Sequence, residues 1–318
     1  MAKPSPKLPL LKPMLAITGE PFDSPDFLFE VKWDGIRCLA YLTGETVLYS
    51  RNGNDLTYRY PELAGLHREV TGGPMILDGE IVVFEGDKPS FHRLLARDRL
   101  HNNFRIRQAA AEYPAVLMVF DLLYYKGESQ MGLPLKDRKQ LLADLPVSCP
   151  NLRLSEYILK DGVEFYQAVC RLELEGMIAK QLDSLYFPGK RSHCWHKIKR
   201  IFEEDLVICG YTRGKGRRQS LGSLILGGYQ GDRLVYAGLV GSGLSEEGIQ
   251  EIQQLLQPLK REQSPLDQFP TLPQAQWVAP ELVCTVKFLE RTNSGEIRHS
   301  SFNGLRFDKE PEECRLSQ

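Results

Sequence analysis

The sequence predicts an α+β protein of two domains: a larger mixed domain over residues 1–200 and a small β-barrel over residues 201–318. The first observation is length, because 318 residues exceed the roughly 100–200 residues of one domain. The second is the alternation of apolar and polar residues within 27–50, which has the period of a β-strand. The third is a change near residue 201 to short apolar runs separated by glycine-rich turns.

The larger domain alternates strand-like and helix-like segments after an extended, proline-rich arm. The runs FLFEVKWDG and ETVLYS, joined through RCLAYLTG, are the first two strand-like runs. Ser90 has the residue type of a helix N-cap and precedes a long helical pattern. We therefore expect further strands over 75–84 and 115–125, and helices over 90–113, 135–145 and 162–176.

The smaller domain contains four or five short strands and one amphipathic helix over 245–259. Ser245 is the expected N-cap of that helix, whose isoleucines and leucines form one stripe. Short strands with a single inserted helix favour a Greek-key barrel of the OB type. Any other small β-barrel remains the alternative at this point.

Charge is balanced over the whole chain but uneven along it. The net charge of −1 excludes a uniformly basic nucleic-acid binder, but not an enzyme with its basic residues gathered on one face. Residues 180–218 hold ten basic and four acidic side chains, and residues 88–107 hold six and one. Such clusters suit a phosphate backbone, although a charge run is more often a solvated face.

The cysteines and the N-terminus bear on the compartment. Seven scattered cysteines without a CxxC pair favour neither a disulfide framework nor a zinc ribbon, so a reducing cytosol is expected. The prolines of the N-terminal segment argue against a signal peptide. No stretch approaches the roughly 20 apolar residues that span a bilayer. We expect a cytoplasmic protein, in a bacterial cytosol or nucleoid, without a membrane partner.

The segment from Glu30 to Arg37, EVKWDGIR, is the first with chemical content. Lys32 follows a strand-like run and precedes a DG turn. A lysine amine becomes a nucleophile when burial or a nearby cation lowers its pKa. On this segment alone, an edge-strand lysine before a hairpin turn is an equally good interpretation.

The segment resembles the KxDGxR motif of the covalent nucleotidyltransferases, which include ATP-dependent ligases and mRNA capping enzymes. The sequences of three segments are most similar to the ligase domain of bacterial end-joining DNA ligases: SRNGNDLT, EGMIAKQLDSLYFPGKRS and IRHSSFNGLR. The resemblance implies an ATP-grasp-like nucleotidyltransferase domain of antiparallel sheets and helices, followed by an OB-fold domain. Further blocks similar to the family's follow in its order: Ser50-Arg51-Asn52-Gly53, Leu77-Asp78-Gly79-Glu80, Val119-Phe120-Asp121, Glu175-Gly176-Met177-Ile178-Ala179-Lys180, Trp195-His196-Lys197-Ile198-Lys199 and Arg306-Phe307-Asp308-Lys309.

The resemblance implies a role for each residue that handles the nucleotide. Lys32 would take AMP from ATP as a phosphoramidate and release pyrophosphate. Glu30 would accept a hydrogen bond from the adenine amino group, and adenine would stack on Phe120. Arg37 and Glu80 would hold the ribose. Without the resemblance, Phe120 is more simply a core residue, and the charged side chains are surface positions.

The remaining blocks would handle phosphate and metal. Arg51 would bind the 5′-phosphate of the nucleic acid, since its planar fork donates two hydrogen bonds at once. Glu175 and Glu80 would bind Mg²⁺ or Mn²⁺ through hard carboxylate oxygens. Lys197 and Lys199 are two apart, so a strand would place both on one face, near the α-phosphate.

The last block lies in the second domain. Arg306 and Lys309, with Asp308, would orient the pyrophosphate, which implies that the barrel closes over the ATP site. Phe307 stands where an acidic residue is more familiar. A zinc site at His193, Cys194 and His196 is disfavoured, because these residues lack the usual paired spacing.

The resemblance therefore predicts an ATP-dependent DNA ligase that seals nicks through a lysyl-AMP and a DNA-adenylate, with a role in end-joining repair. Its partners would be nicked duplex DNA and a Ku-type end-binding protein, and the enzyme would be a monomer. An RNA ligase or a GTP-using capping enzyme is the alternative within the class. A nicked-DNA binding module without activity is the alternative outside it, and the intact lysines and glutamates of the motifs argue against that.

Overall fold

The computed structural model describes residues 8–147, 149–214, 221–292 and 294–316. The chain divides into two compact units, Met1–Arg200 and Ile201–Gln318. Both strands and helices are present, so the α+β prediction is confirmed. Among the described residues, no helix is long and apolar enough to cross a lipid bilayer.

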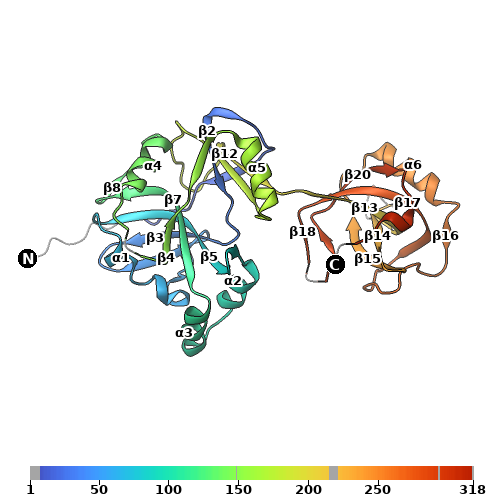
Figure 1. Cartoon of the computed structure of the whole chain (residues 1–318), viewed down its shortest axis with the longest axis horizontal. Coiled ribbons are helices and arrows are strands. Elements are labelled where there is room, and N and C mark those ends of the chain that lie inside the picture. Colours follow the sequence, from blue (N-terminus) through green and yellow to red (C-terminus); the bar gives the residue numbers. More distant parts are fainter. Residues whose placement is uncertain (1–7, 148, 215–220, 293, 317–318) are drawn as a thin grey trace, which may run out of the picture. The chain divides into compact units, whose positions relative to one another are not determined.

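Two sheets organise the first unit (Figure 1). One has the order β1-β12-β11-β2-β10, and its strands are β1 (Leu15–Thr18), β2 (Ser24–Val31), β10 (Tyr157–Lys160), β11 (Gly176–Gln181) and β12 (Arg191–Lys199). The other has the order β4-β3-β5-β7-β8, with β6 paired to β5 and β9 paired to β7. Its strands are β3 (Ile36–Leu42), β4 (Thr46–Ser50), β5 (Met75–Glu85), β6 (Lys88–Pro89), β7 (Ala115–Tyr125), β8 (Glu128–Ser129) and β9 (Leu152–Leu154).

Short helices surround these sheets: α1 (Leu66–Glu69), α2 (Phe91–Asp98), α3 (Asn103–Glu112), α4 (Leu135–Ala143) and α5 (Gly162–Arg171). The Ser90 side chain accepts from the Arg93 N–H, which confirms the predicted cap. The single helix expected over 90–113 is wrong, because the chain leaves the helix after Asp98 and Asn102 caps a second one. The joining segment RCLAYL is itself a strand, β3, and β2 belongs to the other sheet.

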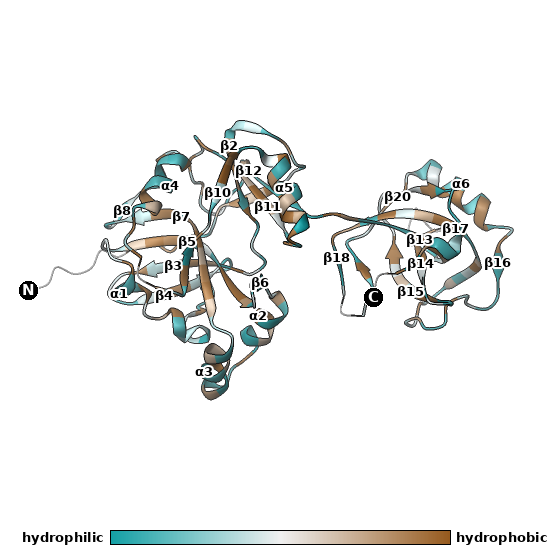
Figure 2. Ribbon diagram, viewed as in Figure 1, coloured by the Kyte–Doolittle hydropathy of each residue, from teal (hydrophilic) through white to brown (hydrophobic). Residues whose placement is uncertain are grey.

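The core of the first unit lies along the long strands of the seven-stranded sheet. In Figure 2, β5 and β7 are mostly hydrophobic, whereas the helices carry many hydrophilic residues. Leu77, Ile81 and Val83 of β5 pack with Leu117 and Val119 of β7 in one buried cluster. The first nine residues of β7 are buried, which explains its nearly continuous apolar sequence.

The second unit is a β-structure with one long helix, as expected. Its main sheet has the order β15-β14-β13-β17-β16, with β20 paired to β17. Ser245 caps α6 (Glu246–Leu256) by accepting from the Gly248 N–H, and Ile249, Ile252 and Leu256 are buried. The strands are β13 (Phe202–Thr212), β14 (Ser223–Gln230), β15 (Arg233–Val240), β16 (Lys260–Arg261), β17 (Ala275–Phe288), β18 (Glu290–Arg291), β19 (Ile297–Arg298) and β20 (Ser301–Arg306).

Candidate active site

A pocket of about 330 Å³ opens in the first unit and collects most of the predicted residues. Strands of the five-stranded sheet contribute Glu30, Lys197 and Lys199, and Lys32 directly follows one of these strands. Strands of the seven-stranded sheet contribute Arg37, Glu80 and Phe120. Arg51, which directly follows β4, completes the set. The two sheets therefore bring together residues that are up to 169 positions apart in the sequence.

Lys32 directly follows β2, and its backbone N–H donates to the Gly176 carbonyl at 2.9 Å. Its Nζ contacts Oε2 of Glu175, whose other oxygen lies 3.0 Å from Nζ of Lys199. Glu175 thus connects the predicted nucleophile to a predicted phosphate-binding lysine. Burial lowers the pKa of Lys197, and the positive charges of Arg191, Lys199 and Lys32 lower it further. This wall of the pocket favours an incoming anion.

Glu80 is a carboxylate that lines the pocket. Burial raises its pKa to about 8; the positive charges of Arg37 and Lys32 oppose that rise, and the negative charge of Glu175 adds to it. Among the described residues, no cluster of three or more histidine, cysteine or acidic side chains could hold a metal alone. Two carboxylates near one anion-binding wall nevertheless fit Mg²⁺, which usually binds one or two carboxylates together with substrate phosphates.

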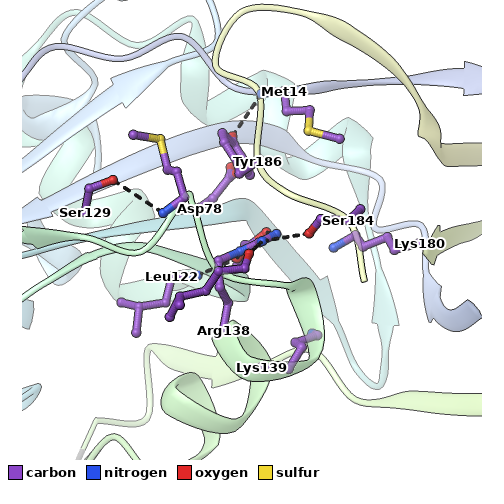
Figure 3. Close-up of polar contacts among 12 residues, drawn as sticks. Met14, Asp78, Leu122, Ser129, Arg138, Lys139, Lys180, Ser184 and Tyr186 are labelled. Atoms are coloured by element: carbon purple, nitrogen blue, oxygen red, sulfur yellow. Dashed lines mark hydrogen bonds and ion pairs between the residues drawn. The ribbon is translucent and has the colours of Figure 1, made fainter. Parts of the chain in front are cut away.

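Arg37 is held in place by Asp78, which is fully buried. The Arg37 guanidinium donates to both Asp78 oxygens, from Nε at 2.6 Å and from Nη2 at 2.7 Å. Tyr186 also donates to Asp78, at 2.7 Å, and its hydroxyl accepts from the Met14 N–H at 2.9 Å (Figure 3). Burial disfavours the charged guanidinium, but Asp78 outweighs this and raises the pKa of Arg37. Arg37 therefore stays charged at the pocket.

Phe120 lines the pocket and lies close to two cations. The Arg37 guanidinium carbon lies 4.4 Å from the ring centroid of Phe120, and Nζ of Lys180 lies 4.2 Å from it. Lys180 also lies 4.4 Å from the ring centroid of Trp195. The buried Nε1 of Trp195 has no hydrogen-bond partner among the described residues, so a donor for a ligand is available there. The stacking of adenine on Phe120 stays a prediction.

Glu30 is only 1% exposed and is paired with two buried lysines. Nζ of Lys180 lies 2.6 Å from Oε2 of Glu30, and Nζ of Lys139, on α4, contacts Oε1. Burial lowers the pKa of Lys180 to about 8, although the Glu30 charge opposes the shift. Sequence reasoning missed both lysines as site residues. Lys180 is the last residue of the EGMIAK block, so its position in the motif could have identified it. Lys139 belongs to no motif of the family.

A buried ion pair supports the same wall from behind. Asp121 follows Phe120 on β7, and Arg138 of α4 donates to its two oxygens at 2.7 Å and 2.8 Å. Nη1 of Arg138 also donates to the carbonyl of Leu133 and to that of Ser184, and Figure 3 shows Ser184 beside the guanidinium. Both charged side chains are 0% exposed. This contact fixes the middle of β7, where Phe120 lies next to Asp121.

Arg51 belongs to a second pocket as well, and the last predicted block lies in the other unit. Arg51 also lines a smaller pocket of about 230 Å³ with Lys12 and Asn52. Arg306 and Lys309 belong to the second unit, where both contact Asp205. Arg306 and Lys309 therefore lie close to each other in the structure. Their action on ATP stays a prediction.

The α+β fold and the lysine-centred pocket define a nucleotidyltransferase-type domain. The family model described as "ATP dependent DNA ligase domain" matches residues 13–199, and "ATP dependent DNA ligase C terminal region" matches residues 217–309. The chain belongs to the ATP-dependent DNA ligase family. The C-terminal match agrees with the expected OB-like domain.

Relatives and solved structures agree with this assignment. The chain is 36% identical over 311 residues to the multifunctional non-homologous end joining DNA repair protein LigD of Mycobacterium tuberculosis. That match covers 95% of this chain but only 39% of LigD. A DNA ligase of Thermococcus fumicolans is 32% identical over 304 residues, covering 90% of this chain and 53% of the relative. The structure of "mycobacterial DNA ligase D complexed with ATP and MES" matches with a TM-score of 0.54 and 34% identity, covering 96% of this chain and 98% of that one.

Proposed function

We propose that this chain is an ATP-dependent DNA ligase that seals nicks in duplex DNA through a lysyl-AMP and a DNA-adenylate. The observation that carries the proposal is Lys32 in a pocket lined also by Glu80, Lys197 and Lys199. The carboxylate of Glu175 contacts the ammonium groups of Lys32 and Lys199. A nucleophilic amine, an anion-binding wall and carboxylates for a metal are what phosphoryl transfer from ATP needs.

In the first step, Nζ of Lys32 forms a bond to the α-phosphorus of ATP, and pyrophosphate leaves with the bonding electrons. The ammonium group has to lose a proton first, and Glu175 contacts Nζ and is placed to accept it. Lys197 and Lys199 would stabilise negative charge on the phosphate oxygens. Glu80 and Glu175 would hold Mg²⁺, which supplies further charge neutralisation when bound.

The next two steps use the same pocket. AMP would pass from Lys32 to the 5′-phosphate of the nick, near Arg51. The 3′-hydroxyl oxygen then bonds to that phosphorus, and AMP is expelled. Arg37, fixed by Asp78, would keep the ribose in one position during all three steps. Trp195 and Lys180 offer donors to the base, whereas Glu30 offers an acceptor.

Nick sealing tests this proposal. A 5′-phosphorylated nick in duplex DNA, incubated with ATP and Mg²⁺, is expected to be sealed by the wild-type chain and not by Lys32→Ala. Lys260→Ala is the matched control, because Lys260 is an exposed lysine of the second unit. Parallel reactions with GTP and with a nicked RNA strand identify the nucleotide and the substrate. Sealing that needs GTP, or that works only on RNA, would contradict the proposal.

We further propose that the enzyme acts in end-joining repair, as a monomer in the bacterial cytosol, with a Ku-type end-binding protein. The likeness to LigD over 95% of this chain supports this. Addition of a bacterial Ku-type protein is expected to increase joining of linear duplexes but not sealing of nicks. Equal stimulation of both reactions, or of neither, would contradict the partnership. Sedimentation in the absence of DNA tests the monomeric state.

A further inference from the structure

One acidic residue of the second unit, Asp205, organises the predicted pyrophosphate-handling block. Asp205 lies on β13 opposite Thr285 of β17. Thr285 in turn lies opposite Gly304 of β20, and Arg306 lies two residues further along β20, opposite Val283. Because side chains alternate along strands, Asp205, Thr285 and Arg306 lie on one face of the sheet.

Three donors converge on the Asp205 carboxylate. The Thr285 hydroxyl donates to Oδ1 at 2.5 Å, and Lys309 Nζ donates to Oδ2 at 2.8 Å. Nη1 of Arg306 donates to Oδ2 at 3.2 Å. The Asp205 side chain is 14% exposed. Burial opposes its ionisation, but the hydrogen bonds from Lys309 and Thr285 outweigh burial and lower the pKa of Asp205. The carboxylate therefore stays charged as a fixed anchor.

The two cations keep an open side. Arg306 is 39% exposed and Lys309 is 27% exposed, so both can contact a second anion while they remain attached to Asp205. Asp308 accepts from Nε and Nη2 of Arg306 at 2.8 Å and 2.9 Å, which fixes the plane of the guanidinium. Thr285 fixes the anchor itself, because its hydroxyl holds one oxygen of Asp205 in place.

We propose that Asp205 is a positioning residue that holds Arg306 and Lys309 for the pyrophosphate-releasing step. This inference rests on the proposed ligase function. In that step a bond forms between Lys32 Nζ and the α-phosphorus, and pyrophosphate is the leaving group. In the sealing step, the 3′-hydroxyl oxygen displaces AMP, and no pyrophosphate is present. Loss of Asp205 therefore impairs the first reaction and spares the last.

The experiment separates these two reactions in the full-length chain. Single-turnover formation of the enzyme–AMP adduct is measured with α-labelled ATP, and sealing is measured on a chemically pre-adenylated nick without ATP. Asp205→Asn keeps the shape and one acceptor oxygen but removes the charge. We expect the adenylation rate to fall about 10- to 100-fold, as for the loss of a charge-assisted hydrogen bond. The rate of sealing of the pre-adenylated nick is expected to stay at the wild-type value.

Matched variants guard against a purely structural effect. Glu203→Gln changes an exposed acid two residues away on β13 and is expected to leave both rates unchanged. Asp205→Glu restores the charge and is expected to recover part of the adenylation rate. If Asp205→Asn does not fold, Thr285→Val removes one anchor contact instead, and it is expected to slow adenylation without slowing sealing.

The outcomes are distinct. An equal fall in both rates would show a general structural role, and an unchanged or faster adenylation rate would show that the cations do not need this anchor; either result overturns the inference. Failure of the wild-type chain to form any adduct would instead contradict the proposed function.

Discussion

Removing the guanidinium of Arg138 should destabilise the first unit strongly. Arg138 and Asp121 are both 0% exposed, and Arg138 also donates to two backbone carbonyls. Arg138→Met leaves the Asp121 carboxylate buried without its cation. Breaking a buried ion pair from one side typically costs about 3–5 kcal/mol. For a unit of 200 residues, each kcal/mol lowers the melting temperature by about 2–4 °C, so the expected loss is about 6–20 °C.

Scanning calorimetry with hydrogen exchange is the assay. The loss should appear in the transition whose exchange maps to Met1–Arg200, while peptides of Ile201–Gln318 keep their protection. The double variant Arg138→Met with Asp121→Asn should recover much of the stability, because no uncompensated charge remains. A loss below about 1 kcal/mol in the single variant, or a double variant less stable than the single one, would refute the reasoning.

Three further predictions follow from the pocket and the charge distribution. First, burial lowers the pKa of Lys180 to about 8, so between about pH 8 and 10.5 the unfolded chain binds more protons than the folded one. The free energy of unfolding should therefore rise with pH in this window. Denaturant titrations should find a smaller rise in Lys180→Met. Second, chelation of Mg²⁺, or Glu175→Gln, should abolish the AMP adduct from labelled ATP; an adduct of normal yield in EDTA would contradict the carboxylate-metal assignment. Third, with a net charge of −1, binding to intact duplex should be weak and should fall steeply with salt in filter-binding assays, so tight salt-insensitive binding would count against nick recognition.

The sequence predicts those features of the fold that depend only on residues close together in the chain. Ser90 and Ser245 cap their helices as predicted, because an N-cap depends on the side chain and the next turn alone. The break between α2 and α3 was missed because His101, Asn102 and Asn103 interrupt the pattern without a glycine or proline. The pattern predicts a connection in place of the strand β3, because an apolar run alternates poorly when most of its residues are buried.

The residues of the candidate site also fall into two groups, those that the motifs predict and those that only the tertiary structure shows. The ordered motifs led to Lys32, Arg37, Glu80 and Phe120, and the two sheets bring them into one pocket. The pairing of Glu30 with Lys139 could not be read from the sequence, because 109 residues separate them and the packing of α4 brings them together. Long-range pairing of this kind depends on tertiary structure, which motif spacing does not encode.

Mapping the AMP adduct to a residue tests the central claim most directly. The chain is incubated with α-labelled ATP and Mg²⁺, digested, and the labelled peptide is identified by mass spectrometry. We predict one adduct, on Lys32 and labile to acid as a phosphoramidate, with Lys32→Ala unlabelled although its circular dichroism is unchanged. Label of undiminished yield in Lys32→Ala, or an adduct mapped to another residue, would contradict the account.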